Sequence, residues 1–308
     1  MRLLITGGHG SLGRATFLEA IKRFPSAIIE CPTRDELNLL KLEQTKDFIE
    51  KFKPTHVVHL AARVFGIQGH LNFPMDSLIQ NTQIDLNIFS ALSENPPKWI
   101  FYSSTVAAYG FPYDNIPLQE SDLFKGEPHS SEYGYAQSKR FAYAYLKLLE
   151  KEKNTQFTYG LLTNLYSAED RFLGGNGHVL ISLVNKALEA KLGNEVLSIW
   201  GSGRATRDFL STHSASGIIC DLFDQNLGII NIGTGVEIGI DQIAKVIEKE
   251  FLLEKGYVFT GQKEGILNRY SDIQKLQKYS KIANELDPLE EIKRFIREYA
   301  GNHLTSAI

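Results

Sequence analysis

A glycine-rich turn close to the N-terminus constrains the fold of this chain more than any other feature. Arg2–Thr6 is a short apolar run of the kind that forms a buried parallel strand, and three glycines follow it directly. Gly7 allows a tight turn, Gly10 lets the backbone approach a pyrophosphate, and Gly13 lets the next helix pack close to the strand. That helix begins with free N–H groups that suit phosphate oxygens. We therefore predict a dinucleotide site with contacts from Gly7, Gly10, Ser11, Leu12 and Gly13.

The rest of the N-terminal half alternates apolar runs typical of strands with stretches typical of helices. The expected strands span residues 27–31, 56–62, 99–103 and 157–162. The expected helices span residues 42–52 and 78–92, with a third around Tyr135. This alternation predicts an α/β fold with a doubly wound parallel sheet.

The alternation stops after Asn164, which indicates a second structural unit. We expect a dinucleotide-binding domain at residues 1–164 plus about 205–232, with the chain returning to the sheet near Phe209 and at Ile229–Ile232. Residues 165–204 plus 233–308 then form a smaller substrate-binding lobe. Because no Gly/Ser-rich or Pro-rich linker separates the two units, a cleft should lie between them.

Tyr135 and Lys139 are spaced for chemistry on one helix face. Residues four apart on a helix have Cβ atoms about 5–6 Å from each other. A lysine ammonium beside a phenol favours the phenolate and lowers its pKa, which makes the tyrosine a usable proton donor or acceptor. The same spacing is also found in ordinary surface pairs on amphipathic helices. Downstream of the glycine turn, the pair indicates an oxidoreductase.

Composition narrows the function classes. The net charge of −3 gives no electrostatic footprint for nucleic acid. The sequence contains no apolar run of the roughly 18 residues that suggest a membrane span, and its start does not resemble a secretory signal. Cys31 and Cys220 are best explained as reduced structural thiols. We expect a cytoplasmic enzyme with a small-molecule substrate and no metal, nucleic-acid or membrane partner.

Several short motifs carry a family resemblance. His59–Ala62 and Ser103–Gly110, together with the glycine turn and the Tyr135/Lys139 pair, resemble the extended short-chain dehydrogenase/reductases that act on nucleotide sugars. The nearer resemblance within them is to the GDP-L-fucose synthases, the epimerase/reductases of GDP-4-keto-6-deoxymannose. It also covers Thr33–Leu40, Thr163–Tyr166, Gly177–Val179, Trp200–Gly203, Arg207–Leu210 and Asn231–Gly235. The resemblance implies a Rossmann fold with a C-terminal nucleotide-sugar-binding lobe.

The resemblance also implies catalytic roles. Tyr135 would deliver a proton to the alkoxide that forms when a 4-keto sugar is reduced. Lys139 would hold the pKa of that tyrosine down and hydrogen-bond the nicotinamide ribose, while Thr105 would hydrogen-bond the carbonyl oxygen. Ser103 and Ser104 are close competitors of Thr105, and each hydroxyl could instead cap backbone groups.

One departure from the family pattern separates reduction from epimerisation. The fucose synthases also epimerise C3 and C5 with a cysteine, and Ala107 stands at that position here. The family's histidine persists as His178, which could act as a general acid or base, bind a sugar hydroxyl or anchor a loop. The simplest inference is a C4 reductase that leaves C3 and C5 unchanged.

The cofactor preference depends on the end of the second strand, where enzymes that use NAD present an acid. Pro32 stands there, and the guanidinium of Arg34 just beyond it suits a 2′-phosphate, so we expect NADP(H). NAD(H) stays open because Glu30 is close and Arg34 could be a surface residue. The resemblance adds Leu60, Ala61, Ala62 and Lys139 to the cofactor contacts.

The substrate contacts implied by the resemblance are one amide and several cations. They are Asn164, His178, Lys186, Arg207 and Arg269. Cationic side chains are the partners that two phosphates need, although each could instead be a solvated surface charge. Trp200 could cover the base or sugar, or belong to the core.

Three function classes remain compatible with the sequence. The first is an NADPH-dependent C4 reductase of a GDP-linked 6-deoxyhexose or heptose, serving bacterial surface-polysaccharide synthesis. The second is a redox-neutral epimerase or a bifunctional epimerase/reductase, and the third is a non-catalytic cofactor-binding protein. Family members commonly dimerise through the helix that carries the tyrosine and lysine. We therefore expect a homodimer, with Phe141, Tyr143, Ala144, Leu146 and Leu149 as the apolar surface unless that stripe is intramolecular.

Overall fold

The computed structural model describes residues 1–308 except 65–68, 70, 169–178, 263–264 and 305–308. Its main sheet has the strand order β10-β5-β4-β3-β1-β2, and every neighbouring pair is parallel. The strands are β1 (Arg2–Thr6), β2 (Ile28–Glu30), β3 (His56–His59), β4 (Trp99–Thr105), β5 (Gln156–Leu162) and β10 (Gly228–Ile232). The predicted doubly wound parallel sheet is confirmed.

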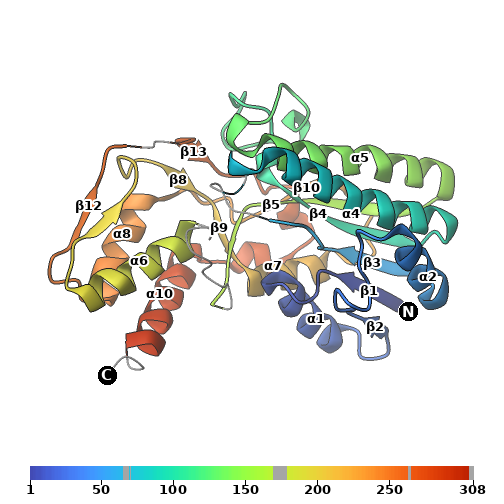
Figure 1. The fold of residues 1–308 in the computed structure, drawn as a ribbon, viewed down its shortest axis with the longest axis horizontal. Helices are drawn as coiled ribbons and strands as arrows, with labels where there is room; N and C mark the ends of the chain where they lie inside the picture. The colour runs from blue at the N-terminus through green and yellow to red at the C-terminus, as the bar shows by residue number, and fades with distance from the viewer. Residues whose placement is uncertain (65–68, 70, 169–178, 263–264, 305–308) are drawn as a thin grey trace.

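Helices cover both faces of this sheet (Figure 1). On one face lie α2 (Leu42–Phe52), α4 (Pro74–Glu94) and α5 (Tyr133–Lys153), whose apolar side chains share a core with β4 and β5. On the other face lie α1 (Ser11–Arg23) and α7 (Thr212–Asp221), in a second core with β1, β3 and β10. A sheet buried on both faces explains why β3 reads His-Val-Val-His with all four residues buried.

The C-terminal part forms a lobe around a third core (Figure 1). Its helices are α6 (Val179–Gly193), α8 (Ile240–Glu250) and α10 (Pro288–Leu304). Its strands pair in small sheets, namely β7 (Leu197–Ile199) with β12 (Tyr257–Phe259), and β8 (Thr206–Arg207) with β11 (Ile238–Gly239) and β13 (Asn268–Arg269). No helix in the described ranges is both long enough and apolar enough to cross a bilayer.

The chain does not return to the main sheet at Phe209, contrary to the expectation from sequence. Phe209 begins β9 (Phe209–Ser211), which pairs with β6 (Asn164–Tyr166) in a separate two-stranded sheet. The expected return at Ile229–Ile232 does occur, because β10 pairs with β5 over its whole length. β10 occupies the edge of β5, and the segment at Phe209 pairs instead with β6, which follows β5 in the chain.

One short segment does not pack in the lobe to which its sequence position assigns it. Ile273, Leu276 and Ala283 fall within 233–308, yet their side chains belong to the core formed with α1 and α7. They come from η4 (Leu276–Lys278), α9 (Lys281–Glu285) and the chain just before them. This segment therefore packs against the nucleotide-binding part before α10 packs in the lobe again.

Candidate active site

A cavity of about 1470 Å³ lies at the carboxyl ends of β1, β3 and β4 and extends to the lobe. Its lining includes the glycine turn, the start of α5, and side chains of α6, β8 and β13. Pockets for one small ligand usually measure about 300–1000 Å³, so this cavity has room for a cofactor together with a substrate. Its position is where open α/β sheets bind their ligands.

The glycine turn has the geometry expected of a pyrophosphate cradle. Gly7 has φ +71°, and a Cβ there would lie 2.7 Å from the backbone N of Ala61. A Cβ on Gly13 would lie 2.2 Å from the carbonyl oxygen of Gly7, so helix and turn touch. At Gly10 the nearest atom would be 3.5 Å away, and α1 begins beside it without a side-chain cap. The turn thus exposes backbone and an α-helix N-terminus to the cavity, which fits a diphosphate.

The adenosine end of the predicted cofactor site also lines the cavity. Pro32 and Arg34 contribute to the lining, and so do Leu60, Ala61 and Ala62 from the end of β3. Glu30 does not line it. Glu30, the acid that could have favoured NAD(H), therefore lies outside the cavity. Arg34, the cation that suits a 2′-phosphate, lines it.

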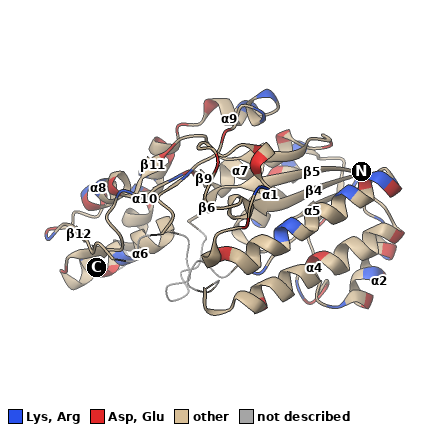
Figure 2. Cartoon of the chain, turned by 90° about the horizontal axis from the view of Figure 1, so that it is seen from above, with Lys and Arg blue, Asp and Glu red and all other residues tan. Residues whose placement is uncertain are grey.

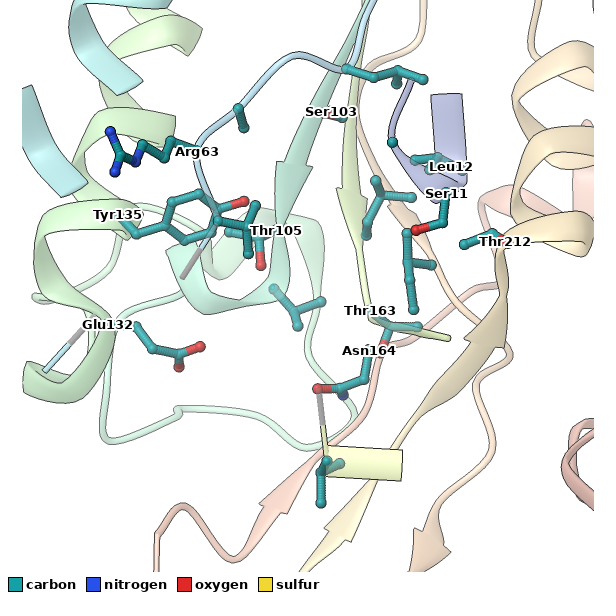
Figure 3. Close-up of a pocket in the computed structure, with 18 of the residues that line it drawn as sticks. Ser11, Leu12, Arg63, Ser103, Thr105, Glu132, Tyr135, Thr163, Asn164 and Thr212 are labelled. Carbon is teal, nitrogen blue, oxygen red and sulfur yellow. The ribbon is translucent and has the colours of Figure 1, made fainter. Parts of the chain in front are cut away.

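Tyr135 and Thr105 come together from different elements. Tyr135 lies in the first turn of α5 and Thr105 is the last residue of β4, and Figure 3 shows the phenol ring pointing toward Thr105. The Thr105 hydroxyl accepts a hydrogen bond from the backbone N of Ala107 at 3.2 Å, which caps the short 3₁₀ turn η1 (Val106–Ala108). Two hydroxyl groups are thereby held at the same part of the cavity.

Lys139 lies beneath this pair and does not line the cavity. Its side chain is buried, and its Nζ donates to the carbonyl oxygen of Ser103 at 2.8 Å. The same Nζ is 5.7 Å from the centre of the Tyr135 ring. Ser104 is engaged as well, because its hydroxyl donates to the Tyr159 hydroxyl at 2.8 Å. The Ser104 hydroxyl is thus less available than that of Thr105 to meet a carbonyl group, whereas the contact at Ser103 involves only its backbone oxygen.

The electrostatics of the pair differ from the sequence expectation. Burial raises the pKa of Tyr135 above its ordinary value, and the negative charges of Asp85 and Glu132 add to that rise. Burial lowers the pKa of Lys139. The expected lowering of the tyrosine pKa is absent because the phenol is desolvated and the ammonium is directed at the Ser103 carbonyl. Tyr135 is therefore a protonated phenol at neutral pH.

Cationic side chains gather at the lobe end of the cavity. Arg207 Nη1 donates to the carbonyl oxygens of Thr206 and Leu267, at 2.6 and 3.1 Å. Arg269 pairs with Glu132 at 2.6 Å and is 5% exposed. Burial, with the neighbouring charge of Arg269, lowers the pKa of Arg207 to about 10. For Arg269 burial also lowers the pKa, but the charges of Glu132 and Tyr113 and the hydrogen bonds to them together outweigh it, and the pKa is raised overall.

Asn164, Lys186 and Trp200 complete this end of the cavity. Asn164 Nδ2 donates to the carbonyl oxygen of Asp208 at 3.0 Å, which orients the amide at the start of β6 (Figure 3). Lys186 Nζ lies 4.6 Å from the centre of the Trp200 ring, and both side chains line the cavity. Trp200 is 53% exposed, so it belongs to the cavity wall and not to the core.

The cavity lining thus includes every described site residue expected from the sequence except Lys139, which is buried next to Tyr135. His178 lies outside the described residues. Ala107 is buried and does not contribute to the lining. Sequence reasoning missed Glu132 and Asp85. Glu132 precedes Tyr135 by only three residues, and Asp85 continues a four-residue spacing of buried polar side chains, Ser77, Asn81 and Asp85, on α4.

The chain is similar to GDP-sugar synthases over most of its length. A GDP-L-fucose synthase of Dictyostelium discoideum is 28% identical over 85% of this chain and 83% of its own length. GDP-L-colitose synthase of Yersinia pseudotuberculosis is 27% identical, over 81% of this chain and 82% of its own length. These matches agree with the resemblance carried by the sequence motifs.

Solved structures share the fold, and a family model covers most of the chain. A GDP-L-fucose synthetase of Naegleria fowleri superposes with a TM-score of 0.86 at 25% identity, over 99% of this chain and 94% of its own, and a second structure of it has NADP bound. MlghC, a GDP-mannoheptose C4 reductase of Campylobacter jejuni, gives 0.83 at 22% identity over 98% of both chains. The model of the NAD dependent epimerase/dehydratase family matches residues 3–233, and the chain belongs to that family.

Proposed function

We propose that this enzyme reduces the C4 keto group of a GDP-linked sugar, a 6-deoxyhexose or a heptose, with NADPH. The observation that carries the proposal is the meeting of Tyr135 and Thr105 at one point of the cavity, between the glycine turn and the cationic end. A nicotinamide cofactor bound at the glycine turn, and a keto sugar whose diphosphate is held by the cations, would both reach that point.

The chain's own residues supply the proton in this reaction. Bound NADPH supplies the hydride that adds to C4. The raised pKa of Tyr135 keeps its phenol protonated, so it can donate that proton to O4 as negative charge develops there. Thr105 donates a second hydrogen bond to the same oxygen, and the positive charge of Lys139 beneath the ring favours the phenolate that remains. Solvent then returns a proton to Tyr135.

The phosphate-binding groups support the choice of substrate and cofactor. Among the described residues, the lobe end of the cavity has three cations, Arg207, Arg269 and Lys186, and one acid, Glu132. The buried Nε of Arg269 has no hydrogen-bond partner among the described residues. That surplus of positive charge and donors suits a sugar nucleotide diphosphate. Arg34, and the NADP held by the Naegleria fowleri relative, support NADP(H).

Loss of the cysteine supports reduction without epimerisation at C3 and C5. The methyl group of Ala107 can transfer no proton, and Ala107 is buried within η1. A relative of the same fold is named a C4 reductase. A bifunctional epimerase/reductase is the second candidate, because the relatives include fucose and colitose synthases and His178 could act alone.

The test follows absorbance at 340 nm with NADPH and freshly generated GDP-4-keto-6-deoxymannose, in deuterated water, with the product examined by NMR. We expect NADPH oxidation and no deuterium at C3 or C5. Deuterium at either carbon would favour the bifunctional enzyme. No oxidation with this sugar, with a GDP-4-keto heptose or with NADH would refute the reductase.

We further propose a cytoplasmic homodimer, formed through α4 and α5, that supplies precursors for bacterial surface polysaccharide. The two helices lie side by side on the outside of the sheet (Figure 2). Leu146 and Leu149 are buried in the protein's own core, so the expected apolar stripe is partly intramolecular. Phe141 and Leu148 on α5, with Ile79 on α4, are exposed. Light scattering of Phe141→Glu should show monomers where the wild type shows dimers.

A further inference from the structure

A chain of buried polar side chains runs beneath the catalytic pair. It joins Thr6 at the end of β1, His59 on β3, Asp85 on α4 and Tyr102 on β4. The Thr6 hydroxyl is 2.6 Å from His59 Nδ1, His59 Nε2 is 3.0 Å from Asp85 Oδ1, and the Tyr102 hydroxyl donates to Asp85 Oδ2 at 2.6 Å. All four residues are at most 2% exposed. The proposed reaction uses none of them directly.

The hydrogen bonds around Asp85 suit a carboxylate that only accepts. The backbone N of Ala61 donates to the Thr6 hydroxyl oxygen at 3.3 Å. The Thr6 hydroxyl can donate its hydrogen to His59 Nδ1, and we assign the matching tautomer, with the imidazole hydrogen on Nε2 facing Asp85. Asp85 therefore accepts one hydrogen bond at each oxygen, from an imidazole and from a phenol. This is how a buried carboxylate keeps its charge.

The negative charge of Asp85 lies near a buried cation, Lys139, and can compensate its positive charge. Lys139 is buried, and its Nζ lies 4.6 Å from the centre of the Tyr102 ring, whose hydroxyl holds Asp85. A buried ammonium is costly unless an opposite charge compensates it. Burial lowers the pKa of Lys139 and the negative charge of Asp85 raises it, and Asp85 is the acid that acts on it among the described residues.

The other titratable groups around Lys139 do not take this role. Burial raises the pKa values of the phenols that face it, Tyr102, Tyr135 and Tyr159, so they are neutral at physiological pH. Glu132, at the start of α5, is paired with Arg269. Arg140, on the next turn of α5, donates to the carbonyl oxygens of Ala108, Leu123 and Gly126.

We propose that Asp85 is a positioning residue that supplies the counter-charge of the catalytic pair and keeps the Lys139 ammonium charged inside the protein. His59 and Tyr102 hold the Asp85 carboxylate in place. Through Thr6 the same chain connects this charge to the turn that cradles the cofactor. The inference rests on the proposed reductase function, because it assigns a role to Lys139 in that reaction.

The kinetic test is the alkaline limb of the profile of kcat against pH. Reduction needs a protonated Tyr135 and a charged Lys139, and the charge of Asp85 raises the pKa of both. Without that charge both groups lose their protons at lower pH. We expect Asp85→Asn to move the alkaline limb toward neutral pH by about one unit or more, the usual effect of one nearby charge.

Matched variants separate charge from structure. Asp85→Glu keeps the charge and should keep the limb within a small shift of the wild type. Asp122→Asn removes another buried carboxylate, one that binds Lys125 and Asn115 away from the cavity, and should leave the limb in place. Should Asp85→Asn fail to fold, Asp85→Ser serves as the second neutral variant. An unmoved limb in a folded neutral variant would overturn the proposal.

A readout without substrate separates this inference from the proposed function. The protein is labelled with ¹³C at lysine Cε, the Lys139 resonance is assigned by its loss in Lys139→Arg, and its titration midpoint is measured with NADP⁺ bound. We expect a lower midpoint in Asp85→Asn than in the wild type. If the midpoint is lowered but the enzyme reduces no keto sugar, only the proposed function is refuted. If the midpoint is unchanged in an active reductase, only the role of Asp85 is refuted.

Discussion

The two ends of the cavity are suited to anions in opposite ways. At the glycine turn the protein offers backbone: Gly10 leaves the approach open and α1 begins without a side-chain cap. At the lobe end it offers side chains, among them Arg207 and Arg269, whose charges are partly balanced by Glu132. The first end uses seven consecutive residues, and the second gathers residues that are far apart in the sequence. A side chain added at Gly7 or Gly13 would clash with the backbone of the cradle, whereas the cationic end should lose affinity group by group.

Tyr135→Phe should have the largest effect, because it removes the proton donor at the point where the two ends meet. We expect kcat to fall by about 10²–10⁴-fold, the usual contribution of general acid catalysis. NADPH affinity, measured by fluorescence titration, should change little. Tyr133→Phe, an exposed neighbour on the same helix, is the control. A kcat close to that of the wild type would assign the proton to another group.

Gly13→Ala tests the backbone end. The new Cβ would lie 2.2 Å from the carbonyl oxygen of Gly7, so the turn or the helix must move. We expect NADPH affinity to fall by about 10–100-fold, because accommodating an added group in a packed site costs about 1–3 kcal/mol. Gly301→Ala, where a Cβ meets nothing within 4 Å, should bind NADPH normally. Normal binding by Gly13→Ala would show that the turn is not a close-fitting cradle.

Arg207→Met tests the side-chain end. Loss of one charged donor should raise KM for the GDP-sugar by about 10–100-fold and leave NADPH affinity unchanged. Arg204→Met, exposed and outside the cavity lining, is the control. Since burial lowers the pKa of Arg207 to about 10, its charge is lost as the pH rises through that value. KM of the wild type should therefore rise there, and KM of Arg207→Met should not.

Arg34→Ala should have the smallest effect, because this guanidinium is exposed and screened by salt. We expect the preference for NADPH over NADH to fall by about tenfold, with the difference shrinking at high ionic strength. Glu30→Gln, outside the cavity lining, should leave the preference unchanged. If the preference survives Arg34→Ala, the 2′-phosphate is recognised elsewhere.

Local patterns predicted most of the nucleotide-binding part. The strands of the main sheet and the glycine turn were predictable because alternation and glycine spacing are properties of neighbouring residues. The catalytic candidates Thr105 and Tyr135 were found through their motifs, and the cavity brings them together. Glu132 and Asp85 were not found, because an acid in a helix gives no sign of which side chains will surround it.

The sequence by itself determined the order of strands and helices, the backbone cradle and the types of catalytic side chain. Each of these depends on a few consecutive residues. Only the tertiary structure decided that Phe209 pairs with β6 instead of the main sheet, that Lys139 is directed at the Ser103 carbonyl, and that the pKa of Tyr135 rises. Strand pairing depends on which edge is free, and a pKa depends on desolvation and on charges brought near from distant segments. Neither is therefore encoded in any local stretch of sequence.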